Sequence, residues 1–201
     1  MTPAEVYILA ERTFNDVVQK ITDQQFESTL PEWFPLGGSQ DRGSLTLRTL
    51  ISYHTYDTAW IPDTFAGTPI DDVGSRYDGD LVGDDPRGSY RRYSERAVQA
   101  IVDDFDPTRI VHFSYGDYPA AEAITHPTSF RVFRTYDIAK LVGQDRSLPD
   151  ELCDEFWATV EPHVEMWRQM GVFQTPLPVP DGADAQARLF ARAGRDPDWR
   201  R

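Results

Sequence analysis

Apolar positions recur at helical spacing in several stretches of the chain, and the first stretch is the clearest. Thr2-Pro3-Ala4-Glu5 has the spacing of a capping box with proline at the first helical position. The residues that follow on one face are Val6, Ala10, Phe14, Val17 and Ile21. This pattern predicts an amphipathic helix that begins at Pro3.

Four further helices and a short last one follow from the same periodicity and from capping and breaking residues. We expect Pro127 to kink or split one of them, and Pro162 to kink the next. The expected ranges are about 44–60 with Ser44 as cap, 89–105, 119–142, 149–170, and a short helix within 184–194 ended by Gly194.

The connections between these helices are long and rich in glycine and proline. Residues 23–44 form a long loop, and residues 68–88 form an aspartate-rich surface loop with room for one short turn of helix. Residues 109–115 are extended and are followed by a turn at Gly116-Asp117. Four long helices with such connections predict an all-α fold, an antiparallel four-helix bundle.

We expect a single domain over residues 1–201, in which residues 175–201 form a rigid connector, the short helix and a tail. A content of 40% hydrophobic and 12% aromatic residues is enough for a sizeable core. The start of the chain lacks the basic and apolar blocks of a signal peptide, and no apolar run approaches the roughly 20 residues that span a bilayer. These features predict a cytoplasmic protein.

The net charge and the cysteine content limit which classes of partner and of metal site we expect. The formal net charge is −13, which disfavours a nucleic-acid backbone or an anionic membrane as partner, since both favour basic patches. The single cysteine, Cys153, forms neither an internal disulfide nor a cysteine-rich metal site. A small-molecule partner is the remaining class.

Candidate chemistry gathers on two of the predicted helices. On the helix over 44–60, three side chains fall near one face and His54 lies on the adjoining face; the three are Tyr53, Asp57 and Trp60. The helix over 119–142 supplies Phe130, Arg131, Arg134 and Asp137. We expect Tyr53, His54, Asp57 and Arg134 as catalytic candidates, and Trp60, Phe130, Arg131 and Asp137 as substrate-binding candidates.

Arg134 falls one turn after Phe130, on the apolar stripe of its helix. A buried guanidinium needs a partner or a ligand, because an unpaired buried charge is very expensive. Two interpretations are open. Arg134 forms a structural ion pair with Asp57 or Asp137, or it binds an anion in a pocket.

Two other features also allow a structural and a functional interpretation. His54 is a packed core histidine or a general base, and Trp33-Phe34 is a local hydrophobic plug or a lid over a pocket. No pair of histidines has the i, i+4 spacing of a helical metal site, and phosphate-binding loops and nucleophile elbows are absent from the sequence.

Several unusual strings, in order between about Leu47 and Trp199, resemble the DinB-like superfamily. The resemblance is to the branch that includes the N-terminal metal-binding domain of mycothiol-dependent maleylpyruvate isomerase. The strings are LRTLISYHTYDTAWIPDTFAG, DDVGSRYDGDLVGDDP, RIVHFSYGDYPAAE, YDIAKLVGQD, WRQMGVFQTPLPVP and GRDPDW. The first 45 residues match less well and lack the PCPGW-like loop of the family. The resemblance implies a DinB-like four-helix bundle and makes a homodimer plausible.

In that family three side chains hold a divalent metal: a histidine on the second helix, and a carboxylate and a histidine four residues apart on a later one. Carried over without gaps, the resemblance puts these positions on Tyr53, Phe130 and Arg134. None of the three is the ligand type that the family uses. We therefore expect a metal-ligand set that has been replaced, with the guanidinium of Arg134 in place of the metal charge.

The expected function is accordingly that of an enzyme with a repurposed, metal-independent pocket. It would carry out acid–base chemistry, such as isomerisation or cyclisation, on a small anionic or aromatic organic substrate. One alternative, implied by the resemblance, is a mycothiol-dependent isomerase or thiol S-transferase with a divalent metal such as zinc or nickel. The other is a small-molecule binding protein without turnover.

Overall fold

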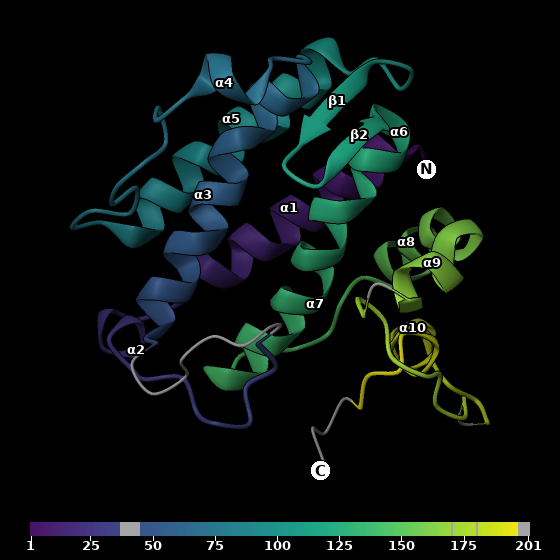
Figure 1. Ribbon diagram of the computed structural model, residues 1–201. Helices are drawn as coiled ribbons and strands as arrows, with labels where there is room; N and C mark the ends of the chain where they lie inside the picture. Colours follow the sequence, from purple (N-terminus) through teal and green to yellow (C-terminus); the bar gives the residue numbers. More distant parts are fainter. Residues whose placement is uncertain (37–44, 170, 180, 197–201) are drawn as a thin grey trace.

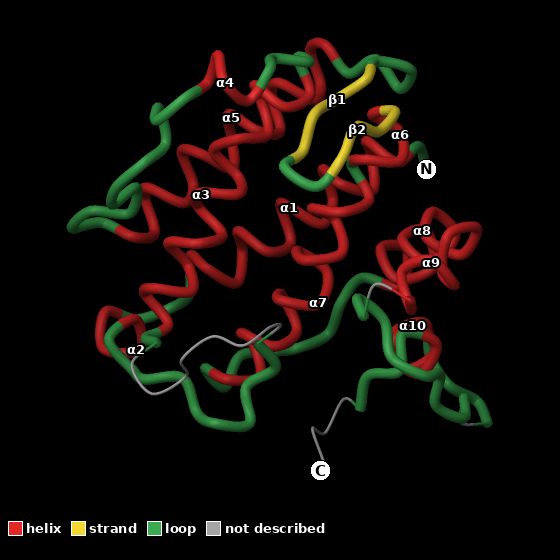
Figure 2. Tube along the Cα trace, in the orientation of Figure 1, coloured by secondary structure: helices red, strands yellow, loops and turns green. Residues whose placement is uncertain are grey.

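The computed structural model describes residues 1–36, 45–169, 171–179 and 181–196. Within them the fold is mostly helical, with a single small antiparallel sheet (Figures 1 and 2). The helices are α1 (Pro3–Gln19), α2 (Asp23–Phe26), α3 (Leu47–Phe65), α4 (Ile70–Val73), α5 (Pro86–Asp104), α6 (Ala120–Ala123), α7 (Thr125–Leu141), α8 (Asp150–Val160), the 3₁₀ turn η2 (Glu161–His163), α9 (Val164–Gln169) and α10 (Ala185–Arg192); the strands are β1 (Ile110–Phe113) and β2 (Gly116–Pro119).

The longest helices, α1, α3, α5 and α7, form the body of the molecule. Helix α3 packs on α5, α5 on α1, and α1 on α7, so α1 has a long helix on each side. Helix α8 packs on α1 and α7 and carries α10, and the β1–β2 hairpin lies over one end of α3. The all-α prediction is confirmed at this level.

Capping and proline positions define several helix ends as expected. The Thr2 capping box is present, with the Thr2 hydroxyl and the Glu5 side chain each bonded to the other residue's backbone N–H. The helix expected over 119–142 is split into α6 and α7, with Pro127 in the first turn of α7, where its missing N–H costs little. The helix expected over 149–170 is likewise interrupted at Pro162, which lies in η2.

Two helix ranges differ from the prediction. Helix α3 continues past Pro62 to Phe65 instead of ending near Trp60, because Ile61 and Phe65 are buried in a core cluster that outweighs the hydrogen bond lost at the proline. Helix α5 begins at Pro86, because Asp85 caps it through the backbone N–H of Gly88. Ser44, the expected cap of α3, lies outside the described residues, and Thr46 caps the helix.

The extended segment at 109–115 pairs with a second strand that the sequence did not predict. Strands β1 and β2 are antiparallel, with His112 opposite Asp117. The His112 Nδ1 atom lies 2.7 Å from an Asp117 carboxylate oxygen. The hairpin is therefore held by this cross-strand pair as well as by its backbone ladder.

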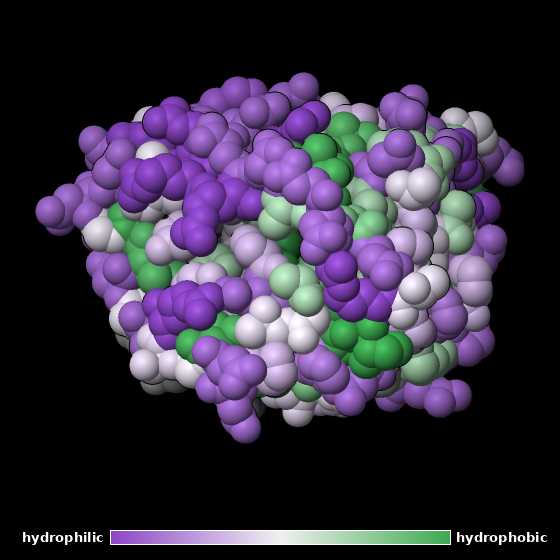
Figure 3. Space-filling view, turned by 90° about the horizontal axis from the view of Figure 1, so that it is seen from above, coloured by the Kyte–Doolittle hydropathy of each residue, from purple (hydrophilic) through white to green (hydrophobic). Residues whose placement is uncertain are grey.

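One face of the molecule shows how hydrophilic and hydrophobic residues are distributed on its surface. Seen from above, it is mostly hydrophilic, with separate hydrophobic patches (Figure 3). None of the helices in the described part of the chain has the length and hydropathy needed to cross a membrane.

A buried polar network connects the long helices at their centre. Arg131 on α7 donates from Nε to the Glu11 carboxylate on α1 at 2.8 Å and from Nη2 to the Thr58 hydroxyl on α3 at 2.5 Å. Tyr90 on α5 donates to the other Glu11 oxygen at 2.6 Å, and Tyr7 donates to Glu11 at 3.3 Å. The Arg131 and Glu11 side chains are both 0% exposed. One ion pair thus has contacts from all four long helices.

We predict that Glu11→Gln lowers the free energy of unfolding by about 3–5 kcal/mol, because it leaves the Arg131 charge buried without its counter-ion. Urea denaturation of both proteins measures this change. Asp154→Asn is the control, since its ion pair with Arg188 lies at the surface and should be worth less than about 1 kcal/mol. Equal losses in the two variants would contradict a central role for the Glu11–Arg131 pair.

Candidate functional site

A cleft of about 380 Å³ has its lining residues mainly on α3, α7 and the β1–β2 hairpin. Its walls are largely aromatic and carry a few polar groups, as is usual for a small-molecule site. The lining side chains include Tyr56, Asp57, Trp60 and Thr64 from α3, His112, Phe113 and Tyr115 from the hairpin, and His126, Phe130 and Arg131 from α7.

Two buried donors among the lining residues have no hydrogen-bond partner in the described structure. These are Arg131 Nη1 and Trp60 Nε1. The other guanidinium donors of Arg131 named above are occupied by Glu11 and Thr58, so Nη1 is the one left over. A buried unpaired donor is costly, and a ligand with acceptor oxygens would satisfy it.

The charge of Arg131 is permanent. Burial lowers its pKa, but the acidic groups around it, Glu11 first among them, raise the pKa by more, so the net direction is upward. The cleft therefore has a fixed positive charge in its wall at every ordinary pH.

Asp57 and His126 are two titratable residues of this cleft whose pKa values are shifted. Partial burial raises the pKa of the Asp57 carboxyl, and the charge of Arg131 lowers it by less. Burial lowers the pKa of His126, which favours the neutral imidazole. The two groups thus approach each other in pKa, and both are suited to exchange protons with a ligand.

Tyr115 fixes the orientation of His126. Its hydroxyl lies 3.0 Å from His126 Nδ1. Partial burial, with Tyr118 and Asp57 nearby, raises the pKa of Tyr115 to about 12. The phenol therefore stays protonated, and its hydrogen bond with Nδ1 holds the imidazole in place, whichever of the two atoms donates.

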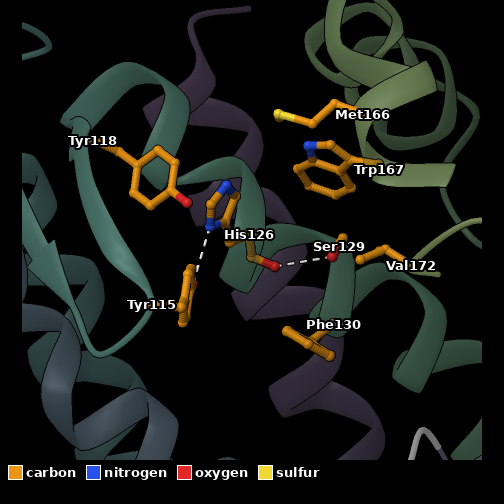
Figure 4. Close-up of a pocket in the computed structure, with 8 residues that line it drawn as sticks. All are labelled: Tyr115, Tyr118, His126, Ser129, Phe130, Met166, Trp167 and Val172. Carbon is orange, nitrogen blue, oxygen red and sulfur yellow. Dashed lines mark hydrogen bonds between the residues drawn. The ribbon is translucent and has the colours of Figure 1, made fainter. Parts of the chain in front are cut away.

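A second hollow, of about 190 Å³, adjoins the cleft (Figure 4). Tyr115, His126 and Phe130 line both spaces. The remaining walls of this hollow are Tyr118, Ser129, Met166, Trp167 and Val172. In Figure 4, Met166 and Trp167 of α9 lie across the hollow from Tyr115.

The structure brings together half of the predicted site residues. Asp57, Trp60, Phe130 and Arg131 all line the cleft. Tyr53 and His54 are not among its described lining residues: Tyr53 is 49% exposed on α3, and His54 is buried against the ring of Phe14, with a centroid distance of 5.2 Å. The expectation that Tyr53 and His54 share a pocket with Asp57 is therefore wrong, because their side chains leave α3 in other directions.

The predicted roles of Arg134 and Asp137 need correction as well. Arg134 donates to Asp137 at 3.0 Å and to the carbonyl of Pro35, and its guanidinium lies 5.4 Å from the centre of the Phe34 ring. Asp137 is 0% exposed and also accepts from Arg195 at 2.7 and 2.8 Å. The structural ion pair is thus the correct interpretation of Arg134. The carboxylate of Asp137 is shared by two arginines rather than offered to a substrate.

Trp33 and Phe34, the two residues considered as a lid, differ in burial. Phe34 is fully buried in the core cluster formed with α1 and α3, and Trp33 is 44% exposed. Neither is a described lining residue of the cleft. The plug interpretation therefore applies to Phe34.

The three positions carried over as metal ligands do not fit a metal. Tyr53 and Phe130 are about half exposed, and Arg134 brings a positive charge. Within the described ranges, histidine, cysteine and carboxylate side chains form no cluster of three with the geometry of a metal site. No step of the chemistry below depends on a metal.

The sequence contained a signal for the missed network. Glu11 falls in line with Tyr7, Phe14 and Val18 on the buried face of α1, so a carboxylate stands where an apolar residue is expected. Tyr115 and His126 were missed for another reason. They meet only because the hairpin folds back onto the start of α7, and no local pattern encodes that contact.

Comparisons of the chain with protein-family models, with curated proteins and with solved structures found no match.

The buried His54 makes the stability of the fold depend on pH. Neither of its ring nitrogens has a hydrogen-bond partner in the described structure, and burial together with the charges of Arg131 and Arg134 holds its pKa well below the usual 6.5. The unfolded chain thus binds a proton that the folded chain resists, so stability falls as the pH drops below about 6.5, by up to about 1.4 kcal/mol per pH unit.

We expect His54→Leu to reduce this loss while leaving stability at pH 8 equal to or above that of the parent, since an unpaired polar group is replaced by an apolar one. Thermal unfolding at pH 5.5 and pH 8 checks this. The same acid-induced drop in both proteins would show that other groups cause it.

Proposed function

We propose that this chain is a small-molecule enzyme that binds an organic anion in the α3–α7 cleft and moves a proton on it. The observation behind the proposal is that a fully buried arginine among the lining residues has one guanidinium nitrogen, Nη1, without a partner among the described residues. Trp60 Nε1 is a second such donor in the same wall. A carboxylate or enolate oxygen satisfies both kinds of donor.

The ion pair with Glu11 makes Arg131 a rigid anchor rather than a flexible one. Two of its nitrogen donors are fixed on α1 and α3, so the position of Nη1 is set before a ligand arrives. Such preorganisation lowers the entropy lost on binding. Because Glu11 balances the charge, the site attracts an anion mainly through hydrogen bonding at close range.

Asp57 and His126 supply the proton transfer in this proposal. A carboxyl with a raised pKa donates a proton, and a neutral imidazole accepts one. An anion on Arg131 raises the pKa of Asp57 further through like-charge repulsion, so a larger fraction of this carboxyl carries a proton when the site is filled. Isomerisation of an organic acid, through a proton removed at one carbon and returned at another, is the reaction class that suits these groups.

We also propose, from the resemblance in the sequence, that the long helices form a DinB-like four-helix bundle. Their packing order and the long connections between them support this. The proposed pocket would then be a departure from the metal chemistry of that superfamily, since Tyr53, Phe130 and Arg134 stand at the ligand positions.

We predict that phenylacetate, used as a probe, binds the protein and that Trp60→Phe weakens the binding about tenfold, because one charge-assisted hydrogen bond is lost. Arg131→Lys should abolish measurable binding, since lysine cannot keep the fork geometry that serves Glu11, Thr58 and the anion together. Isothermal titration calorimetry provides the affinities.

The matched control is Arg195→Lys, which alters an ion-paired arginine outside the cleft. It should bind phenylacetate as the parent does. Circular dichroism of each variant establishes that the fold is retained. Unchanged affinity in both Trp60→Phe and folded Arg131→Lys would refute the anion site.

A pH dependence follows from Asp57. As the pH rises through the raised pKa of this carboxyl, Asp57 becomes charged and repels the anion, so affinity falls. Asp57→Asn should bind phenylacetate more tightly than the parent above that pKa, and with little change in affinity between pH 5 and pH 8. A parallel decline in both proteins would assign the effect to another group.

A further inference from the structure

The proposed proton transfer leaves the hollow next to the cleft unused. Its walls are apolar or aromatic apart from Ser129 and His126. The Ser129 hydroxyl is already donated to the carbonyl of His126 at 2.9 Å (Figure 4). His126 Nδ1 is likewise occupied by Tyr115. The hollow thus offers a ligand mainly apolar contact.

The rim of this hollow exposes large apolar side chains to solvent. Tyr115 is 56% exposed, Phe130 52% and Val172 47%. Single exposed apolar residues are ordinary, but a group of them around a concave space marks a binding site. Trp167, by contrast, is 4% exposed and forms the hollow's fixed wall, held edge-on to His126 with ring centroids 5.4 Å apart.

The hollow and the cleft share three lining residues, Tyr115, His126 and Phe130. Phe130 and Arg131 are consecutive on α7, and Phe130 lines both spaces while Arg131 lines the cleft. A molecule whose acidic group reaches Arg131 therefore passes over the exposed faces of Phe130 and Tyr115 before it arrives at Trp167. Along this path the charge of Arg131 comes first, the aromatic faces of Phe130 and Tyr115 come next, and the apolar wall at Trp167 comes last.

We infer that the ligand is an amphipathic organic acid, with its anionic group at Arg131 and an apolar chain that extends over Phe130 and Tyr115 into the Trp167 hollow. This inference rests on the proposed anion site and specifies its substrate class. A water molecule occupies about 30 Å³ of liquid, so a hollow of about 190 Å³ holds several methylene groups.

The test is a chain-length series of straight-chain carboxylates, butanoate, hexanoate and octanoate, measured by isothermal titration calorimetry below their micelle concentrations, with 1-octanol as the uncharged probe. Each methylene that enters the hollow should tighten binding by up to about fourfold. We expect octanoate to bind at least tenfold more tightly than butanoate, and more tightly than 1-octanol.

Val172→Trp fills the hollow from its rim. It should bring the affinity for octanoate down to that for butanoate while leaving the affinity for butanoate unchanged. Val102→Trp is the matched control, because Val102 is an exposed valine on α5 outside both spaces. It should keep the full dependence on chain length.

The remaining outcomes separate the two proposals. Equal affinity for all three acids would overturn the amphipathic ligand while the anion site stands. Equal affinity for octanoate and 1-octanol, unaffected by Arg131→Lys, would assign binding to the hollow alone and overturn both proposals. Absence of binding by every acid would also overturn both.

Discussion

The structure depends on one ion pair that is closed off from water. Arg131 and Glu11 are fully buried, and each is held by hydroxyl groups from other helices, Thr58 for the arginine and Tyr90 for the carboxylate. Burying such a pair is expensive, and it is tolerated only with good geometry and additional hydrogen bonds. That requirement fixes how α1, α3, α5 and α7 face one another, because each supplies a member of the network.

The cleft follows from the same constraint. Arg131 reaches α1 and α3 at once, and the cleft that it lines also has residues of the β1–β2 hairpin and of the first turn of α7 in its wall. Arg131 thus lines the cleft and also has one nitrogen, Nη1, without a partner among the described residues. Arg131 therefore belongs both to the polar core and to the candidate site. A substitution of Arg131 therefore alters stability as well as binding. Substitutions of Trp60 or Asp57 separate the effect on binding from the effect on stability better.

The sequence predicted the helical architecture well because its signals are local. The Thr2 capping box, the interruption at Pro162 and the amphipathic stripe of α1 each depend on neighbours within a few residues. It predicted the site in part, since Asp57 and Trp60 on one helix and Phe130 and Arg131 on another do line one cleft. It did not identify which arginine faces that cleft. Residues 131 and 134 lie three apart on α7, and only the position of Glu11, remote in the chain, decides between them.

The buried network also bears on how the chain reaches its fold. Glu11 and Arg131 are separated by 120 positions, and Tyr90 lies 79 positions from Glu11. Most helical bundles fold quickly because their contacts are close in sequence. Here Glu11 and Arg131 can neutralise each other only after a long loop has closed. The entropy lost on closing that loop opposes folding before the ion pair contributes any stabilisation. A partly assembled bundle that lacks α7 keeps the Glu11 carboxylate hydrated between its helices, which disfavours premature drying of the core. The Glu11 carboxylate thus finds its buried counter-ion only when α7 packs against α1.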